Sequence, residues 1–568
     1  MMRKHADLKT VVLLLLGALV LYFFMNVICT LYLFPIYPDE IAERAILSRS
    51  WYDFPVISST LRLCKSSMLS LPLIWYIPGT IDWIIHGHIY NLRSLRVVGI
   101  STNIIMLILL TMQLCYMNLH KLASLGKKVA FIFLSLCFVV ACLEIGVMPF
   151  ALIVTRPEQM ILIWLVIMLI IFSIRSESSY ATGKKAMLTI IYFISLLMIL
   201  HSHPKTLFLT PIFLIVAHKL FSDFNSKLYY FLGFFLLMII LVANYAAWSH
   251  FYDCKNIPSA DEVLKSFNIN LGNIKTNPRL FFSEIKSSLL DFNKEIQHIS
   301  FQTHAEVNYL PDIDQTIKIK MANLLLRINY IAVFIGLLLY VIGLNVGDIL
   351  KRKLVTGHLL ALSLLACAIL SQVVNKNKHW YDAGYFWSII IVVFIFMIAD
   401  RANYLSKKKI TLIIMGYLFC VSSYSMYIFT DTFKPYFLKG FVGPSLVDLS
   451  SYNYKKEEED LKEIEKKCNI DVATAENLIL DDSTYLHFQR SKYPFAITYL
   501  FFGASNQRQM LSALLDKYQM GGIILDDKQF YLPDDGNKKY AIHVGHYVCV
   551  PQSKTSEALW MYTRHLFK

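Results

Sequence analysis

Eleven apolar runs, most of them close to 20 residues long, constrain the fold of this chain more than any other feature of its sequence. A helix that crosses the hydrocarbon core of a bilayer needs about 20 consecutive apolar residues. Soluble proteins carry about 25% charged residues, whereas 17% of this chain is charged. The sequence therefore predicts a polytopic α-helical membrane protein with about 11 transmembrane helices. The predicted spans are residues 11–34, 97–118, 129–148, 158–174, 187–201, 206–221, 228–249, 325–346, 355–374, 385–400 and 410–429.

The net charge of +14 is concentrated at one set of span ends. The N-terminus and every second loop after it hold 18 Lys and Arg residues and five acidic residues. The rest of the chain holds 36 Lys and Arg residues and 35 acidic residues. An excess of Lys and Arg in short loops marks the cytoplasmic side. We therefore expect a cytoplasmic N-terminus, with residues 35–96, 250–324 and 430–568 facing outward. Most of the net positive charge is explained by the orientation of the chain in the membrane, so it gives no support to nucleic-acid binding.

Composition changes near residue 429, and this change predicts two regions. Residues 1–429 contain all the apolar runs, interrupted by the long outer loops 35–96 and 250–324. Residues 430–568 show a strand–helix–strand pattern and predict a small extracytoplasmic α/β domain. The elements expected there are a charged helix at 455–467, strands at 477–480 and 522–525, a helix at 505–518 and a third strand at 540–550.

The ten cysteines form no CxxC pair and have no metal-ligand spacing. Four of them, Cys64, Cys254, Cys468 and Cys549, fall outside the predicted spans. Their spacing leaves open whether any two of them form a disulfide.

Two adjacent carboxylates, Asp39 and Glu40, come directly after the first apolar run. A carboxylate where a spanning helix leaves the bilayer is costly unless solvated or paired, which makes it a functional candidate. The simpler interpretation is that the pair caps a short interfacial helix. The other polar clusters decide between these interpretations.

Three further polar clusters are predicted on the same outer side, and the cytoplasmic loops have nothing comparable. Each has an ordinary explanation as well: a helix start, a snorkelling lysine or an aromatic belt. Together they offer cations to hold a phosphate-bearing lipid while a carboxylate removes a proton from an incoming acceptor. The candidate residues in these clusters are Arg156, Glu158, His203, Lys205, His379 and Tyr381.

In their order along residues 1–400 and their common side, these motifs resemble the GT-C glycosyltransferases, closest to the protein O-mannosyltransferases and the lipid A aminoarabinose transferases. The segments that carry the resemblance are Tyr37-Pro38-Asp39-Glu40, Leu71-Pro72-Leu73-Ile74-Trp75-Tyr76, Thr155-Arg156-Pro157-Glu158, His203-Pro204-Lys205 and Lys378-His379-Trp380-Tyr381. The C-terminal region matches neither branch.

The resemblance implies an inverting transfer of a sugar from a polyprenyl-phosphate donor on the outer face of a membrane, in keeping with a bacterial inner membrane. Asp39 would be the general base and Glu40 its assistant. Arg62, Lys205 and His379 would contact the donor phosphate, with Arg156 in the pocket. The acceptor stays open between a lipid, a glycan and a protein. Metal dependence varies within the superfamily, so Mg²⁺ or Mn²⁺ stays open too, and the sequence offers no metal-ligand cluster.

Two other functions fit a multi-span chain with a basic outer face. A transporter or flippase for lipid-linked saccharides would favour internal repeats and charges near mid-membrane, and neither is found in this sequence. An oligosaccharide ligase or polymerase would not require an acidic pair directly after the first span.

Overall fold

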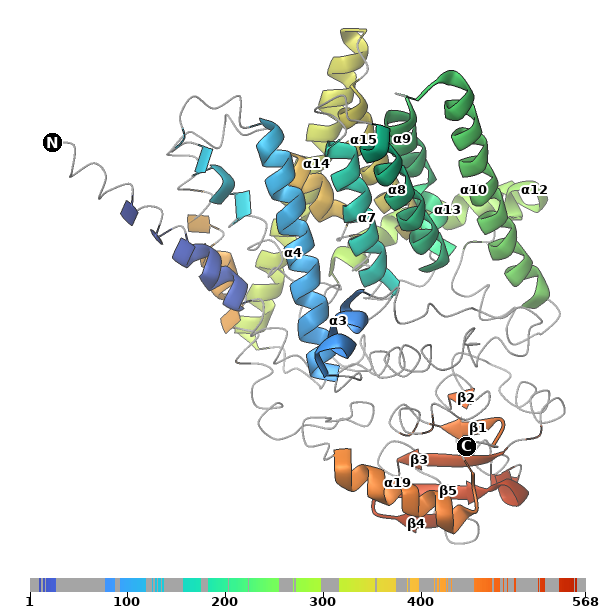
Figure 1. Cartoon of the computed structure of the whole chain (residues 1–568). Coiled ribbons are helices and arrows are strands. Elements are labelled where there is room, and N and C mark those ends of the chain that lie inside the picture. The colour runs from blue at the N-terminus through green and yellow to red at the C-terminus, as the bar shows by residue number, and fades with distance from the viewer. Residues whose placement is uncertain are drawn as a thin grey trace.

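The computed structural model describes a bundle of apolar helices and a separate mixed sheet (Figure 1). The described residues are chiefly 17–26, 77–86, 92–118, 157–174, 182–202, 204–222, 224–254, 272–297, 316–352, 355–373, 389–397, 419–424, 454–471, 475–480, 521–526 and 541–555, with shorter pieces between them.

The helices of the bundle follow the apolar runs of the sequence. Within the described part of the chain, five helices are long and apolar enough to cross a membrane, over Val97–Tyr116, Gly183–Leu200, Ser226–Tyr245, Ile331–Leu350 and Thr356–Val373. Three shorter apolar helices cover Gly17–Asn26, Gln159–Ile174 and Thr206–Phe221. The chain is therefore a polytopic membrane protein. The labelled helices are α3 (Ile77–His86), α4 (Leu92–Asn118), α7 (Pro157–Ile174), α8 (Thr182–Ser202), η4 (Pro204–Leu209), α9 (Thr210–Phe221), α10 (Ser226–Cys254), α12 (Asn273–Thr276), α13 (Pro278–Gln297), α14 (Ile317–Leu350) and α15 (Thr356–Val373).

Apolar side chains from these helices form one continuous core. The hydroxyl of Tyr192 on α8 is fully buried there and donates to the carbonyl of Phe213 on α9 at 3.0 Å. This bond satisfies a polar group that would be costly to leave alone in an apolar interior. Tyr22 and Ser423, from the first and last predicted spans, share a hydrogen bond of 2.7 Å. The two ends of the predicted membrane region are therefore neighbours in space.

Two predicted spans differ from the structure. The span predicted at 206–221 begins as the 3₁₀ helix η4, and the α-helix that follows it has only 12 residues. The rise of about 1.5 Å per residue makes α9 too short to cross a bilayer by itself. The span predicted at 325–346 lies within α14, which extends past it at both ends. Parts of the predicted spans 129–148, 385–400 and 410–429 lie outside the described residues.

The C-terminal part contains a five-stranded sheet in the order β2-β1-β3-β5-β4 (Figure 1). Strand β1 pairs in parallel with β2 and β3, and β5 pairs antiparallel with β3 and β4. The helix α19 (Tyr454–Cys468) packs Leu461 and Ile464 into the same apolar core as the sheet. The strands are β1 (Leu478–Leu480), β2 (Phe495–Ala496), β3 (Gly522–Asp526), β4 (Ile542–Val544) and β5 (Tyr547–Pro551).

The predicted helix at 455–467 and the strands at 477–480 and 522–525 are confirmed as α19, β1 and β3. The prediction of one strand at 540–550 is wrong, because this stretch is the hairpin β4–β5. Gly545 turns the chain at φ +60°, a conformation that glycine adopts without steric cost. The alternation of apolar and polar residues continues through the turn, so this pattern does not reveal the turn. The helix predicted at 505–518 lies outside the described residues.

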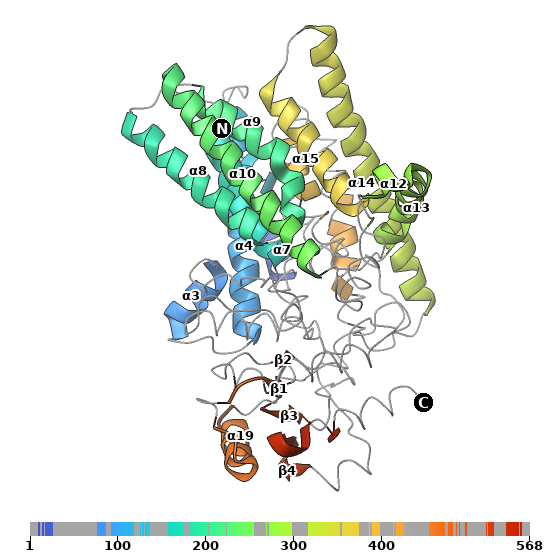
Figure 2. The same ribbon diagram turned by 90° about the vertical axis from the view of Figure 1, so that its right-hand side faces the viewer.

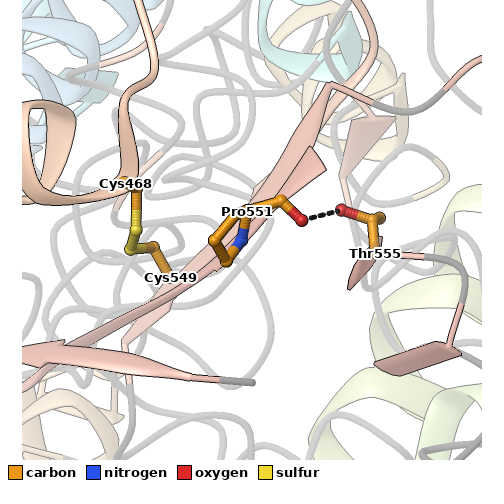
Figure 3. Close-up of a disulfide and its surroundings, with 4 residues drawn as sticks. All are labelled: Cys468, Cys549, Pro551 and Thr555. Atoms are coloured by element: carbon orange, nitrogen blue, oxygen red, sulfur yellow. Dashed lines mark hydrogen bonds between the residues drawn. A yellow bond between two sulfur atoms is a disulfide. The ribbon is translucent and has the colours of Figure 1, made fainter. Parts of the chain in front are cut away.

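A disulfide joins Cys468, the last residue of α19, to Cys549 on β5 (Figure 3). The two Cα atoms are 6.5 Å apart, within the range that a disulfide bridges. The bond closes a loop of 81 residues and holds α19 on the sheet. It also identifies one pair among the four cysteines whose partners the sequence left open.

Candidate functional site

The beginning of α7 and the end of α8 lie at the same end of the bundle. The two helices contact each other, and a short connection joins them, so they run antiparallel. Glu158 is the second residue of α7, and Lys205 is the second residue of η4, directly after α8. The structure therefore brings the backbone positions of these two predicted site residues to one end of the bundle (Figure 1).

A close approach between α4 and α7 adds the beginning of α4 to this end. Gly99 on α4 faces Gln159 on α7 so tightly that a Cβ at position 99 would lie 2.7 Å from the Gln159 Nε2. Gln159 is buried and directly follows Glu158. In both views the β-sheet also lies beyond the end at which α4 and α7 begin (Figures 1 and 2).

The 3₁₀ helix η4 is fixed by hydrogen bonds to the carbonyls of two of its residues. A 3₁₀ turn has poorer internal hydrogen-bond geometry than an α-helix, so its carbonyls are open to other donors. The thiol of Cys367 on α15 donates to the carbonyl of Phe208 at 2.8 Å. The hydroxyl of Thr210 donates to the carbonyl of Leu207 at 2.6 Å. With Leu209 fully buried, the backbone that carries Lys205 is tied to both α9 and α15.

Lys318, near the beginning of α14, is a cation that the sequence analysis did not single out. Its ammonium group donates to the Tyr427 hydroxyl at 3.2 Å, and the Tyr424 hydroxyl donates to the Lys318 carbonyl at 3.2 Å. The hydrogen bond to Tyr427, followed by charge interactions with Tyr427 and Asp431, raises the pKa of Lys318 above its usual value. The signal in the sequence was the pair Lys318 and Lys320 before an apolar run, which by itself is typical of many membrane helices.

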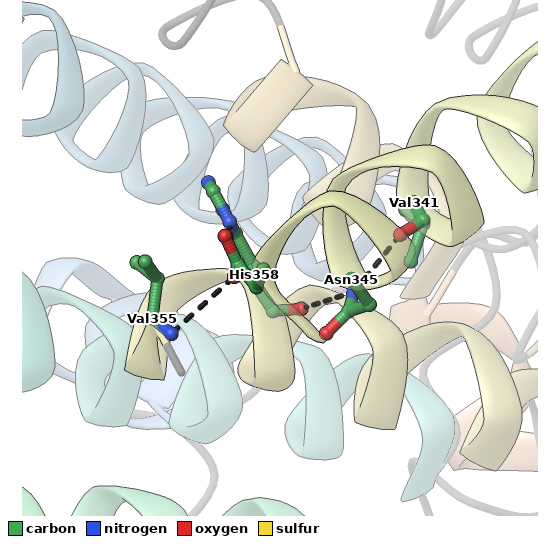
Figure 4. Close-up of polar contacts among 5 residues, drawn as sticks. Val341, Asn345, Val355 and His358 are labelled. Carbon is green, nitrogen blue, oxygen red and sulfur yellow. Dashed lines mark hydrogen bonds and ion pairs between the residues drawn. The ribbon is translucent and has the colours of Figure 1, made fainter. Parts of the chain in front are cut away.

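At the opposite end of the bundle, the turn between α14 and α15 has its own polar contacts (Figure 4). The Oδ2 of Asp348 lies 2.7 Å from the Nδ1 of His358 and accepts from the backbone N–H of Val355 at 3.3 Å. The Nδ2 of Asn345 donates to the carbonyls of Val341 and His358. Asp348 is one of the five acidic residues in the loops that the sequence predicts as cytoplasmic, and its partners come from the next helix, so no spacing within one segment indicates them.

Basic residues mark this opposite end. Lys219, at the end of α9, lies 4.0 Å above the ring of Phe172, near the end of α7. This contact places the ends of α7 and α9 together, away from the beginning of α7. Other described basic residues in this set of turns include Lys184, Lys185, Lys227, Lys351 and Arg352.

Most of the predicted site residues lie outside the described residues, and their roles stay predictions. These are Asp39, Glu40, Arg62, Arg156, His203, His379 and Tyr381. Glu158 and Lys205 are described as positions on helices. Within the described part of the chain, no group of three or more His, Cys, Asp or Glu residues could hold a metal ion.

The apolar helices define this chain as a polytopic membrane protein. Its candidate site lies at the end of the bundle where α4 and α7 begin. No family model and no curated protein matches the sequence. Among solved structures the chain is similar to the oligosaccharyltransferase of Archaeoglobus fulgidus tethered to an acceptor peptide, with 11% identity, a TM-score of 0.45, and coverage of 97% of this chain and 72% of that chain. It is also similar to AglB from the same organism with an inhibitory peptide and a dolichol-phosphate, at 11% identity, TM-score 0.43, and coverage of 90% and 69%.

A third similar structure is the oligosaccharyltransferase of Archaeoglobus fulgidus in complex with Zn and sulfate, at 12% identity, TM-score 0.44, and coverage of 89% of this chain and 67% of that chain. All three are structures of archaeal oligosaccharyltransferase. Identities of 11–12% and TM-scores below 0.5 make this a distant likeness.

Proposed function

We propose that this chain is a membrane glycosyltransferase that moves a sugar from a polyprenyl-phosphate donor to an acceptor at the outer face of the membrane. The observation that supports the proposal is that Glu158 and Lys205 lie at one end of the bundle, the side on which the sequence predicts the other acidic and basic motifs. Asp39 and Glu40 directly follow an apolar first segment, and Glu158 and Lys205 occupy one end of the bundle. Basic turns occupy the other end.

In the proposed reaction Asp39 accepts the proton of the acceptor hydroxyl or amine as this group attacks the anomeric carbon. The bond between the sugar and the phosphate oxygen then breaks with inversion, and polyprenyl phosphate leaves. General base catalysis requires the carboxylate within hydrogen-bond reach of the attacking group. Glu40 assists by orienting the acceptor or sharing the proton.

The leaving phosphate gains negative charge, so cations beside it lower the barrier. Lys205 is the candidate for which the structure gives a scaffold, because η4 is tied to α15 through Cys367. Arg62, His203 and His379 are the other candidates for the phosphate, while Arg156, Glu158 and Tyr381 are candidates for the pocket. A divalent cation, Mg²⁺ or Mn²⁺, could share this charge-neutralising role.

Two observations support an outer location of this end, in keeping with a bacterial inner membrane. Disulfides persist in oxidising compartments, and the Cys468–Cys549 disulfide belongs to the sheet beyond this end of the bundle. Basic residues gather at the other end, as the positive-inside rule expects for the cytoplasmic side. The solved neighbours bind a dolichol-phosphate and an acceptor peptide. For this chain we propose a polyprenyl-phosphate donor and leave the acceptor among lipid, glycan and protein.

The test is lipid analysis of cells with and without the chain. We expect one polyprenyl-phosphate-linked sugar to accumulate in the cells that lack it. Purified chain added to membranes from those cells should release polyprenyl phosphate and glycosylate an acceptor. Movement of the donor between leaflets without cleavage would instead establish a transporter, and the absence of any accumulated donor would also contradict the proposal.

A further inference from the structure

Gln159 is a buried amide in the first turn of α7, directly after the candidate pocket residue Glu158. Its side chain is 1% exposed, and it is the only polar residue between Glu158 and Ser173 in an otherwise apolar helix. Burying an amide in an apolar interior costs free energy that a leucine would avoid. Packing alone therefore does not account for glutamine at this position.

Gly99 on α4 leaves the space that this amide fills. A Cβ at position 99 would lie 2.7 Å from the Gln159 Nε2, 3.1 Å from its Oε1 and 3.2 Å from its Cδ. All three distances are shorter than ordinary van der Waals contact, so the whole amide group lies against the glycine. The amide is the movable end of its side chain, and a methyl group at position 99 would therefore displace it.

A second buried amide, that of Asn103, lies one turn further along the same face of α4 as Gly99. Its Nδ2 donates to the carbonyl of Gly99 at 3.1 Å. Its Oδ1 is buried and has no hydrogen-bond partner among the described residues. The beginning of α4 therefore has polar groups on the face that meets Gln159, whereas the face further along is apolar.

The first turn of α7 needs an anchor to hold Glu158 in one place. The first N–H groups of a helix have no acceptor within the helix, so this turn is the part most easily loosened. Pro157 restricts the backbone on one side of Glu158, and the buried Gln159 and Met160 hold it on the other. Because Glu158 and Gln159 are adjacent, a movement of the first turn that follows loss of the amide contact also moves Glu158.

We propose that Gln159, in contact with Gly99, is a positioning residue that holds Glu158 in the candidate site. This role rests on the proposed glycosyltransferase activity, in which Glu158 is a candidate for the pocket. The Gln159 amide is buried between two helices, so it acts through Glu158 rather than on the substrate. A misplacement of about 1 Å can cost about 10²-fold in rate, so loss of the Gly99–Gln159 contact should be visible in turnover.

The first test measures the exposure of the first turn of α7 and relies on no activity. A cysteine replaces Glu158 in the full-length chain in lipid nanodiscs, and mass spectrometry follows its modification by a polar maleimide. Gln159→Met keeps an unbranched side chain but removes the amide, and Gly99→Ala displaces it. We expect both substitutions to raise the modification rate at position 158 several-fold.

Two control variants separate loss of this contact from general effects on the helices. Gly233→Ala on α10 adds a methyl group where nothing lies within 4 Å. Val166→Ala removes fully buried apolar volume two turns further along α7. Both controls should leave the modification rate at position 158 unchanged. Equal rates in all variants, the absence of any modification, or the same increase in Val166→Ala would overturn the proposal.

The second test measures polyprenyl phosphate release and asks whether Gln159 acts through Glu158. Gln159→Met should lower the release rate at least about tenfold in the chain that keeps Glu158, and it should add little in the Glu158→Gln background. A purely structural role would lower the rate equally in both backgrounds. Equal losses in both, or no loss in either, would overturn the positioning role. A wild-type chain that releases no polyprenyl phosphate would instead refute the proposed function, and the modification rates would still decide whether Gln159 holds the first turn.

Discussion

The thiol of Cys367 donates a hydrogen bond to the carbonyl of Phe208 at 2.8 Å, joining two residues that are 159 positions apart. This contact ties α15 to the 3₁₀ helix η4, and η4 carries Lys205, the candidate phosphate ligand. The candidate site therefore depends on a contact between distant membrane helices as well as on its own motifs.

Cys367→Val should loosen η4, because valine has nearly the same size as cysteine but no donor for the Phe208 carbonyl. An unsatisfied buried carbonyl costs about 1–3 kcal/mol. We expect a lower thermal unfolding midpoint and a several-fold weaker affinity for polyprenyl monophosphate. Cys367→Ser keeps a donor and serves as the matched control. Equal midpoints and affinities for the valine variant and the wild type would contradict the role of this hydrogen bond.

Loss of the Cys468–Cys549 disulfide should destabilise the sheet with α19. Closing a loop of 81 residues is worth about 4–5 kcal/mol in the chain-entropy model. Cys468→Ala should therefore increase proteolysis of the C-terminal part, while Cys115→Ala, at a buried free thiol in α4, should leave that proteolysis unchanged. Mass analysis with a thiol reagent provides the second readout. Modification of Cys468 and Cys549 before any reduction would show that the disulfide is absent.

Asp348 and His358 should stabilise the turn between α14 and α15 as a pair. Asp348→Ala leaves the N–H of Val355 and the imidazole without their carboxylate, and we expect a loss of about 1–3 kcal/mol. His358→Ala should cost less, because Asp348 keeps the Val355 N–H. A double-mutant cycle on thermal midpoints measures the coupling. Strictly additive effects of the two substitutions would contradict the pairing.

Gly545→Ala should destabilise the β4–β5 hairpin for two reasons. The φ of +60° is unfavourable for alanine, and the new Cβ would lie 2.6 Å from the Oδ2 of Asp460 on α19. Limited proteolysis of the C-terminal part provides the measurement. The variant Gly545→Ala with Asp460→Ala removes the clash but keeps the strained φ, so it should recover only part of the lost protection. Protection equal to the wild type in the single variant would contradict this account of the turn.

The sequence predicts the elements whose cause is local. Apolar length predicts α4, α8, α10 and α15, and periodicity predicts α19, β1 and β3. The hairpin at Gly545 and the 3₁₀ start of α9 depend on backbone conformations that a hydrophobic pattern does not encode. Contacts such as Asp348–His358 and Cys367–Phe208 depend on which helices pack together, and no spacing within one segment reveals them.

The candidate site is predicted from sequence in part. Alternation of loop charge predicts that Glu158 and Lys205 share one end of the bundle, and the antiparallel packing of α7 and α8 confirms that their backbone positions do. Lys318 was missed because its partners, Tyr424 and Tyr427, come from another span. The roles of Asp39 and the cationic residues stay predictions.

The most direct test of the central claim is the rate of polyprenyl phosphate release by Asp39→Asn in membranes that contain the accumulated donor and its acceptor. Asparagine keeps the size of aspartate but cannot accept the proton, and general base catalysis contributes about 10²–10⁴-fold. We expect the rate to fall at least about 100-fold, with donor affinity and thermal midpoint close to wild type and a smaller effect for Glu40→Gln. Release by Asp39→Asn at a rate close to the wild type would contradict the assignment of Asp39 as the base.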